Sequence, residues 1–245
     1  MSDLVTWAEI DLAAYAHNLA ELKKLCRPTT RLMAVVKADA YGHGAARLAQ
    51  RAVSAGADWF GVARLEEAVS LRQAGVGVPI LILGFTPVGE ADALIEHDLT
   101  QAILSLPLAS ALSEHAVARG KKIRAHLKID TGMGRIGLVS HPRGPSSPAG
   151  LPVAGTIRDA IAIARLPGIE LEGIFTHLAS ADRPVNGDAG RQLERFSTLV
   201  ERLEREGLHF QLRHAANSAA MIQLPESRLD MVRPGIATYG LHPST

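Results

Sequence analysis

A single lysine directly follows a short apolar run near the amino terminus, and its position suits amine chemistry. Residues 32–36 have the composition of a buried strand, Lys37 comes next, and Gly42 and Gly44 interrupt the chain before a helical pattern starts at Ala45. An amine at the end of a buried strand is partly desolvated, which lowers its pKa and favours the neutral nucleophile needed for Schiff-base formation. The alternative interpretation is a solvated lysine at the rim of a sheet.

Other polar residues follow the later apolar runs, and together they indicate the kind of ligand that the site would bind. The set expected at the strand ends is Lys37, Tyr41, Arg135, His177, His214, Asn217, Ser218, Arg233, Gly235 and Ile236. It combines an amine, imidazoles, two guanidinium groups and small hydrogen-bond donors, without the carboxylate–histidine set of a metal hydrolase. These residue types favour an anionic aromatic ligand held covalently, and we expect no metal.

The elements that must position these residues alternate regularly along the chain. Short apolar runs are separated by amphipathic segments of helical length, and the runs are residues 32–36, 59–62, 80–83, 100–104, 123–129, 171–175, 210–215 and 230–232. This alternation predicts an α/β protein whose parallel strands close into a (β/α)8 TIM barrel. A doubly wound open sheet is the less favoured alternative, because the polar residues are spread over nearly all the strand ends instead of one switch point.

Two segments depart from this alternation. Residues 7–12 alternate apolar and polar side chains, which predicts a short half-buried strand before a helix that Asp11 caps and that runs to Leu25. Residues 140–155 are rich in Pro, Gly and Ser, which predicts a flexible surface loop. We expect residues 1–245 to form one barrel domain, with no second domain in this chain.

The composition is that of a soluble globular protein. Of the 245 residues, 47% are hydrophobic and 21% are charged, and the net charge of +1 shows no basic excess that would favour nucleic acid or a membrane surface. Cys26 is the lone cysteine, and the chain shows neither a secretory signal nor an apolar run of about 20 residues. These features predict a cytoplasmic protein.

Five segments carry a family resemblance. Residues 34–44 (Ala-Val-Val-Lys-Ala-Asp-Ala-Tyr-Gly-His-Gly) resemble the pyridoxal-phosphate attachment signature of alanine racemases. Residues 126–137, 176–177, 214–218 and 232–240 match the same family in the same order, so the resemblance covers essentially the whole chain. It implies a cytoplasmic bacterial isomerase that uses pyridoxal 5′-phosphate to interconvert L-alanine and D-alanine, the latter for peptidoglycan.

The resemblance also implies roles for individual residues. Lys37 would bind the cofactor covalently and act as the base on one face of the substrate Cα, with Arg135 and His177 as the other catalytic groups. Tyr41, Ser218, Gly235, Ile236 and Tyr239 would form the phosphate cup, with Asn217 in the same turn. His177 would lie near the cofactor ring, and Arg233 would face the pyridine nitrogen.

The segment around Arg135 would bind the substrate side. Arg135 resembles the arginine that contacts the cofactor phenolic oxygen and orients the substrate, and Met133, two residues earlier, is also expected to bind the substrate. Lys128 resembles a lysine that some relatives carbamylate and pair with that arginine, while Asp130 either serves the arginine or caps a turn. Considered singly, three further histidines are expected to be structural: His43, His126 and His214.

Family members continue into a second, mainly β domain. That domain takes part in a homodimer and supplies a tyrosine, as the base on the opposite Cα face, to the partner subunit. Because no part of these 245 residues resembles it, we expect this chain alone to bind the cofactor with weak or absent racemase activity. The alternatives are a single-domain protein that binds the cofactor without turnover, a racemase of another small amino acid such as serine, and a cofactor-free Schiff-base aldolase.

Overall fold

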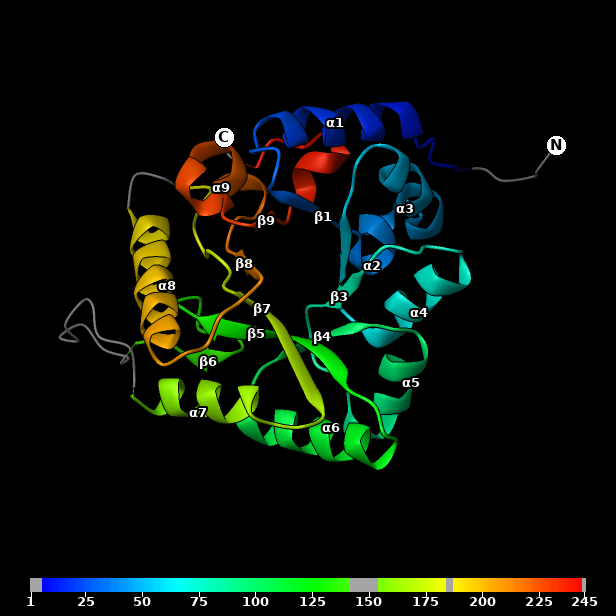
Figure 1. Cartoon of the computed structure of the whole chain (residues 1–245). Coiled ribbons are helices and arrows are strands. Elements are labelled where there is room, and N and C mark those ends of the chain that lie inside the picture. The colour runs from blue at the N-terminus through cyan, green and yellow to red at the C-terminus, as the bar shows by residue number, and fades with distance from the viewer. Residues whose placement is uncertain (1–5, 142–153, 184–186, 244–245) are drawn as a thin grey trace.

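The apolar runs form parallel strands that surround a common axis (Figure 1). A computed structural model describes residues 6–141, 154–183 and 187–243. The strands of the barrel are β1 (Arg31–Val35), β2 (Trp59–Val62), β3 (Ile80–Ile82), β4 (Thr100–Ile103), β5 (Ile123–Asp130), β7 (Ile169–Phe175), β8 (Leu212–His214) and β9 (Met231–Val232). They hydrogen-bond in the order β8-β7-β5-β4-β3-β2-β1-β9, and every pair is parallel.

The first and last strands of this order, β8 and β9, meet through bonds around their ends. The Asp230 amide donates to the Arg213 carbonyl over 3.1 Å, and the Arg233 amide donates to the Ala216 carbonyl over 2.9 Å. The Arg213 guanidinium also donates to the Asp230 carboxylate, with Nε 2.8 Å from Oδ2. The barrel is therefore nearly closed, which confirms the (β/α)8 prediction and shows that the open-sheet alternative is wrong.

Helices follow the strands and cover the outside of the barrel (Figure 1). They are α1 (Leu12–Lys24), α3 (Ala45–Ser54), α4 (Leu65–Gln73), α5 (Ala91–Glu96), α6 (Leu106–Ala118), α7 (Ala154–Ala164), α8 (Asp188–Arg205) and α9 (Ser218–Gln223), with 3-10 turns η1 (Val88–Glu90), η3 (Pro225–Arg228) and η4 (Ile236–Tyr239). None of the helices in the described part of the chain is long and apolar enough to cross a membrane.

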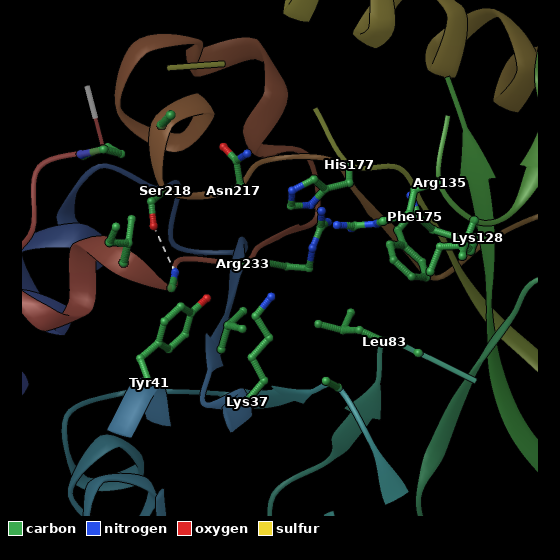
Figure 2. Close-up of a pocket in the computed structure, with 18 of the residues that line it drawn as sticks. Lys37, Tyr41, Leu83, Lys128, Arg135, Phe175, His177, Asn217, Ser218 and Arg233 are labelled. Atoms are coloured by element: carbon green, nitrogen blue, oxygen red, sulfur yellow. Dashed lines mark hydrogen bonds between the residues drawn. The ribbon is translucent and has the colours of Figure 1, made fainter. Parts of the chain in front are cut away.

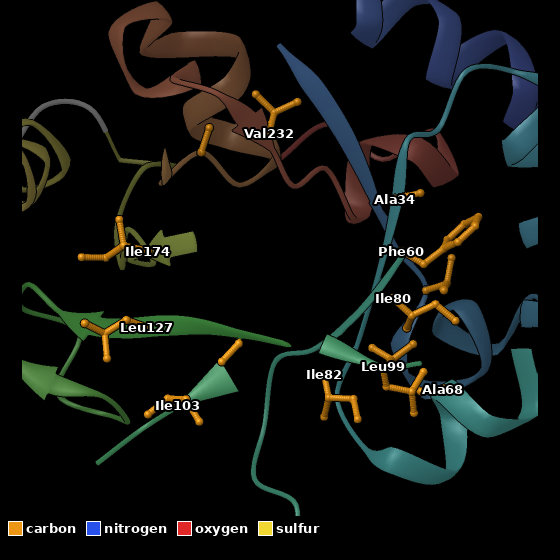
Figure 3. Packing of buried hydrophobic residues seen from close by; sticks show 14 of the residues in the cluster. Ala34, Phe60, Ala68, Ile80, Ile82, Leu99, Ile103, Leu127, Ile174 and Val232 are labelled. Atoms are coloured by element: carbon orange, nitrogen blue, oxygen red, sulfur yellow. The ribbon is translucent and has the colours of Figure 1, made fainter. Parts of the chain in front are cut away.

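The alternation of side chains along each strand divides the core into two layers. Ala34, Phe60 and Ile82 belong to the large cluster between the strands and the helices (Figure 3), and all three are fully buried. Their neighbours Met33 and Trp59 belong to a separate, smaller cluster. Because successive strand residues point to opposite faces, each run must be apolar on both faces, as in a parallel sheet that helices cover.

Two expectations about local structure need correction. Residues 6–11 contain no strand, so the strand predicted at 7–12 is wrong; no strand among the described residues pairs with the segment. The predicted helix cap is confirmed, because Asp11 accepts from the Ala13 and Ala14 amides at 2.8 and 2.9 Å at the start of α1. A short strand that was not predicted, β6 (Leu138–Val139), pairs with β5. Of the loop predicted at 140–155, residues 142–153 lie outside the described residues, and α7 already begins at Ala154.

The segment after Lys37 has an unusual backbone. In α2 (Lys37–Gly42), the four residues from Ala38 to Tyr41 have φ of 51–55° and ψ of 36–52°, which is a turn of left-handed helix without glycine. Such a conformation costs about 1–2 kcal/mol per residue, so contacts from outside the segment must hold it. The sequence predicted only an irregular, glycine-broken stretch here.

Candidate active site

A cavity of about 530 Å3 lies where the carboxyl ends of the strands meet. Its walls include Val35, Lys37, Tyr41, Ala63, Leu83, Lys128, Arg135, Ile136, Phe175, His177, Asp182, Asn217, Ser218, Arg233, Gly235 and Ile236. Figure 2 shows the polar ends of Lys37, Tyr41 and Ser218 turned toward one open space, with the Arg233 guanidinium beside His177. In a (β/α)8 barrel this end carries the functional groups.

One end of the cavity is built from backbone amides and hydroxyls. The Ser218 hydroxyl oxygen accepts from the Gly235 amide at 3.0 Å (dashed in Figure 2) and from the Ala237 amide at 3.2 Å. Its own proton, and the Tyr41 hydroxyl, find no acceptor among the described residues. A side-chain carbon at Gly235 would lie 2.7 Å from the Tyr41 hydroxyl, so only glycine leaves this hollow open. Donors around a small hollow suit a phosphate.

Two residues that were expected near this hollow brace the segments that form it. The Tyr239 hydroxyl donates to the Val35 carbonyl over 3.0 Å, and its ring lies 5.0 Å from the Tyr41 ring, but Tyr239 does not line the cavity. Asn217 lines the cavity, and its carboxamide caps α9 by accepting from the Ala220 amide at 3.0 Å. Asn217 therefore braces the turn that presents Ser218.

Lys37 stands in the cavity without a charged partner. Its Nζ lies 5.8 Å from the centre of the Tyr41 ring, and no hydrogen bond or ion pair joins it to another described residue. The side chain is half-buried and its residue follows β1 directly. An amine that is held at a strand end, partly shielded and unpaired can react with a carbonyl compound.

Arg233 is buried beside the centre of the cavity and is only 4% exposed. Its guanidinium donates to the His214 ring at 2.9 Å, to the Thr176 carbonyl at 2.7 Å and to the Ala215 carbonyl at 3.1 Å. Since a guanidinium has five N–H groups, two remain for a ligand. Burial lowers the pKa of Arg233 to about 9, so the group stays charged at neutral pH.

A hydrogen-bonded chain runs from Arg233 through the barrel interior. Because Arg233 can only donate, His214 must accept at Nδ1 and carry its proton on Nε2, which lies 2.8 Å from Nδ1 of His126. His126 then carries its proton on Nε2, which faces a Glu172 oxygen at 3.4 Å. Burial lowers the pKa of both histidines, which keeps them neutral. The hydrogen bonds thus join Arg233, His214 and His126, and the Glu172 carboxylate lies beyond His126 without a hydrogen bond to it.

Two further basic side chains, Lys128 and His177, also line the cavity. Burial, reinforced by the charge of Arg233, lowers the pKa of Lys128 to about 7, and its amine donates to the Ile129 carbonyl at 3.1 Å. Burial and the same guanidinium lower the pKa of His177 to about 3, so this imidazole is neutral. Asp182 is the only carboxylate among the described residues of the cavity wall, which therefore favours an anion.

The loop that carries Arg135 is held by a neighbouring carboxylate. Asp130 accepts from the Gly132 and Gly134 amides at 2.9 and 3.1 Å. Burial opposes its ionisation, but these bonds and the charge of Lys128 hold the pKa of Asp130 below its ordinary value. Asp130 thus caps the turn, which was one of its two predicted roles. Arg135 lines the cavity, whereas Met133 does not.

The fold and the cavity together define a (β/α)8 barrel with an unpaired lysine, a hollow at Gly235 that carries hydroxyl groups, and a buried arginine in one basic site. Comparisons with known proteins identify the family. Residues 10–243 match the family model described as alanine racemase, N-terminal domain. The chain therefore belongs to the alanine racemase N-terminal domain family.

Individual relatives agree with this assignment. The chain is 48% identical to an alanine racemase of Desulfosudis oleivorans over 244 residues, which cover 100% of this chain and 62% of that protein. It superposes with a TM-score of 0.92 and 36% identity on alanine racemase of Clostridium difficile 630 in complex with cycloserine, covering 100% of this chain and 64% of that one. For the Bacillus anthracis alanine racemase with bound L-Ala-P the TM-score is 0.88, with 32% identity, 98% of this chain and 59% of that one. This chain spans about three fifths of the length of these relatives.

Sequence reasoning missed several residues of the site. Leu83 and Phe175 line the cavity although they were interpreted as strand or core residues; both come at the end of a predicted strand, which is the signal that could have found them. His126 and Glu172 gave no such signal. They belong to the site only through a series of contacts that leads to Arg233, and those contacts cannot be inferred from the sequence.

Proposed function

We propose that this chain forms the pyridoxal 5′-phosphate-binding barrel of an alanine racemase, the enzyme that interconverts L-alanine and D-alanine. The observation that carries the proposal is the unpaired Lys37 amine in the same cavity as the Ser218–Gly235 hollow and the buried Arg233. The names of the relatives favour alanine as the substrate instead of serine. They also favour a catalytic racemase instead of a protein that binds the cofactor without turnover.

The residues present fit this cofactor. The phosphate would bind to Ser218, Tyr41 and the amides of Gly235 and Ile236, where two hydroxyl protons lack acceptors among the described residues and a Cβ would fill the hollow. Lys37 would bind the aldehyde covalently, and Arg233 would donate to the pyridine nitrogen. When bound, pyridoxal phosphate supplies the electron withdrawal that acidifies the Cα–H bond of an attached amino acid.

The side chains around the cofactor would then govern the transfer of the proton at Cα of the substrate. Lys37, once free, removes or returns a proton at Cα from one face through Nζ. Arg233 keeps its own protons, so it polarises the ring nitrogen without protonating it, and the moderate electron withdrawal favours proton return at Cα. His177 stays neutral beside the ring because its pKa is about 3. Arg135, which lines the cavity, would orient the substrate.

A second group must serve the opposite face of Cα. The sequence contains three tyrosines, Tyr15, Tyr41 and Tyr239, and each packs in the cluster behind or at the phosphate hollow. We propose that a tyrosine of a second domain in the partner subunit fills this role in a homodimer. Lys128 is a candidate for carbamylation beside Arg135, because a pKa of about 7 leaves a large share of its amine neutral and able to attack CO2.

Chemical trapping tests the proposal. Borohydride reduction of the cofactor-treated chain should place the pyridoxyl group on Lys37 in a peptide map, and Lys37→Ala should abolish both the label and the yellow colour. A label on another lysine, or none, would refute the proposal. Formation of D-alanine from L-alanine should be weak for these 245 residues and should rise when the second domain of a relative is added.

A further inference from the structure

Glu67 makes an unusual set of contacts just outside the cavity. One carboxylate oxygen, Oε2, accepts from the Ala63 amide at 2.7 Å and from the Arg64 amide at 3.1 Å, so it closes the first turn of α4. The other oxygen, Oε1, accepts from the Ala38 amide at 2.6 Å. A helix cap requires only the bonds to Oε2. The bond from Oε1 therefore ties α4 to a segment 29 residues earlier in the chain.

The Ala38 amide is the peptide group that directly follows Lys37. Its plane also contains Cα and the carbonyl carbon of Lys37. A bond that holds this plane, with β1 holding the chain on the other side, therefore fixes those two atoms and the direction of the Cα–Cβ bond of the lysine. Ala38 is also the first residue of the left-handed turn. In an unconstrained chain these residues would relax toward right-handed or extended conformations, and the amine would move with them.

The far end of the turn has a separate fastening. The Asp39 carboxylate accepts from the Ala45 amide at 2.7 Å, and the Asp39 carbonyl accepts from the Gly44 amide at 3.0 Å. These bonds join the turn to α3. Glu67 alone, among the described side chains, binds the end of the turn next to Lys37.

We propose that Glu67 is a positioning residue for Lys37: its carboxylate holds the left-handed turn and thereby aims the amine at the aldehyde of the cofactor. The inference rests on the proposed function. It gives Glu67 a second role, the positioning of Lys37, in addition to capping α4. The cap and the clamp use different oxygens, so a substitution can separate them.

Glu67→Gln is the discriminating variant. A glutamine has one carbonyl oxygen, and its amide group donates, so it can accept from the helix amides or from Ala38 but not from both sets. Glu66→Gln, at the exposed neighbour on the same helix, is the matched control for the lost charge. Ser105→Ala is the control for a lost helix cap, because Ser105 accepts from the Leu108 amide at the start of α6, away from the cavity wall.

The measurement is the rate at which the full chain captures pyridoxal phosphate in the presence of cyanoborohydride, followed by intact mass and a peptide map. Glu67→Gln should slow labelling of Lys37 at least about tenfold, since a misplaced nucleophile loses effective concentration, while both controls stay within about twofold of the parent chain. Equal rates for Glu67→Gln and Glu66→Gln, with Lys37 labelled in each, would overturn the inference. A parent chain that does not label Lys37 would instead refute the proposed function.

A second measurement does not depend on the cofactor. Ala38 is an exposed residue whose amide should nevertheless exchange slowly with solvent, because the Glu67 carboxylate holds it. Glu67→Asp, which is one methylene shorter, should lose this protection while Glu66→Gln keeps it. Fast exchange of the Ala38 amide in the parent chain would show that the clamp does not exist and would overturn the inference even if Glu67→Gln failed to fold.

Discussion

Replacing Gly235 by alanine should separate phosphate binding from stability. The backbone at Gly235 has φ of −122°, so alanine does not meet the left-handed penalty there. The new Cβ would lie 2.7 Å from the Tyr41 hydroxyl and 3.4 Å from the Tyr41 Cζ. The tyrosine side chain ends at the cavity and can turn away. The substitution therefore acts on the position of one hydroxyl and on the space that the phosphate would occupy.

The size of the effect follows from these contacts. To reach ordinary contact the hydroxyl must move by about 0.7 Å, which is enough to break one hydrogen bond to a phosphate oxygen. A hydrogen bond to a charged group contributes about 1.5–3 kcal/mol. Its loss corresponds to a dissociation constant for pyridoxal phosphate that is roughly 10- to 100-fold higher. The free energy of unfolding of the unliganded chain should change by no more than about 1 kcal/mol.

Absorbance titrations with two aldehydes test this expectation. Pyridoxal 5′-phosphate should bind Gly235→Ala more weakly by the factor above. Pyridoxal, which lacks the phosphate, should bind the variant and the parent chain alike. Urea unfolding of both chains gives the stability comparison.

Gly190→Ala is the control, because a Cβ on that residue of α8 meets nothing within 4 Å. It should leave both affinities unchanged and raise the free energy of unfolding by about 0.5–1 kcal/mol. Unchanged phosphate-ester affinity in Gly235→Ala, or an equal loss for both aldehydes, would contradict the placement of the phosphate at Gly235.

Three further predictions concern the buried ionisable groups. Burial opposes ionisation of Glu172, but its contacts with His126 and Thr100 hold the pKa below the ordinary 4.5, so the stabilisation by the ionised carboxylate is complete above that pH and is lost as the pH falls. In thermal melts, the difference in melting temperature between the parent chain and Glu172→Gln should therefore shrink below about pH 4.5. A difference that stays constant with pH would argue against the ionised Glu172–His126 contact. Because burial lowers the pKa of Lys128 from 10.5 to about 7, the buried charge of Lys128 destabilises the folded chain below pH 7. Lys128→Met should therefore raise the melting temperature most at pH 6, and this increase should decline toward pH 10. An increase that grew with pH would refute the lowered pKa of Lys128. With a pKa of about 3 against an ordinary 6.5, His177 should keep constant NMR ring shifts from about pH 8 to about pH 5, and a titration within that range would show that the ring is solvated.

The positions of the barrel strands, and the residues at their carboxyl ends, could be predicted from the amino-acid pattern alone. Each of the predicted runs from 32–36 to 230–232 overlaps a strand of the barrel, with ends that differ by a few residues. This works because a strand that is covered on both faces must be apolar throughout, and that property is local in the chain. The same reasoning failed at 7–12, where the alternation was present but none of the strands in the described ranges pairs with the segment.

The orientation of the site residues depends on contacts between parts of the chain that are far apart in the sequence. The left-handed turn after Lys37 depends on the bond from Glu67. The orientation of the Arg233 guanidinium depends on its hydrogen bond with His214, which is itself bonded to His126, 88 residues away in the sequence. A local conformation that is unfavourable by itself is stable only where distant groups supply the missing hydrogen bonds. Propensity and pattern describe neighbours in the sequence, whereas these bonds exist only after the barrel has closed.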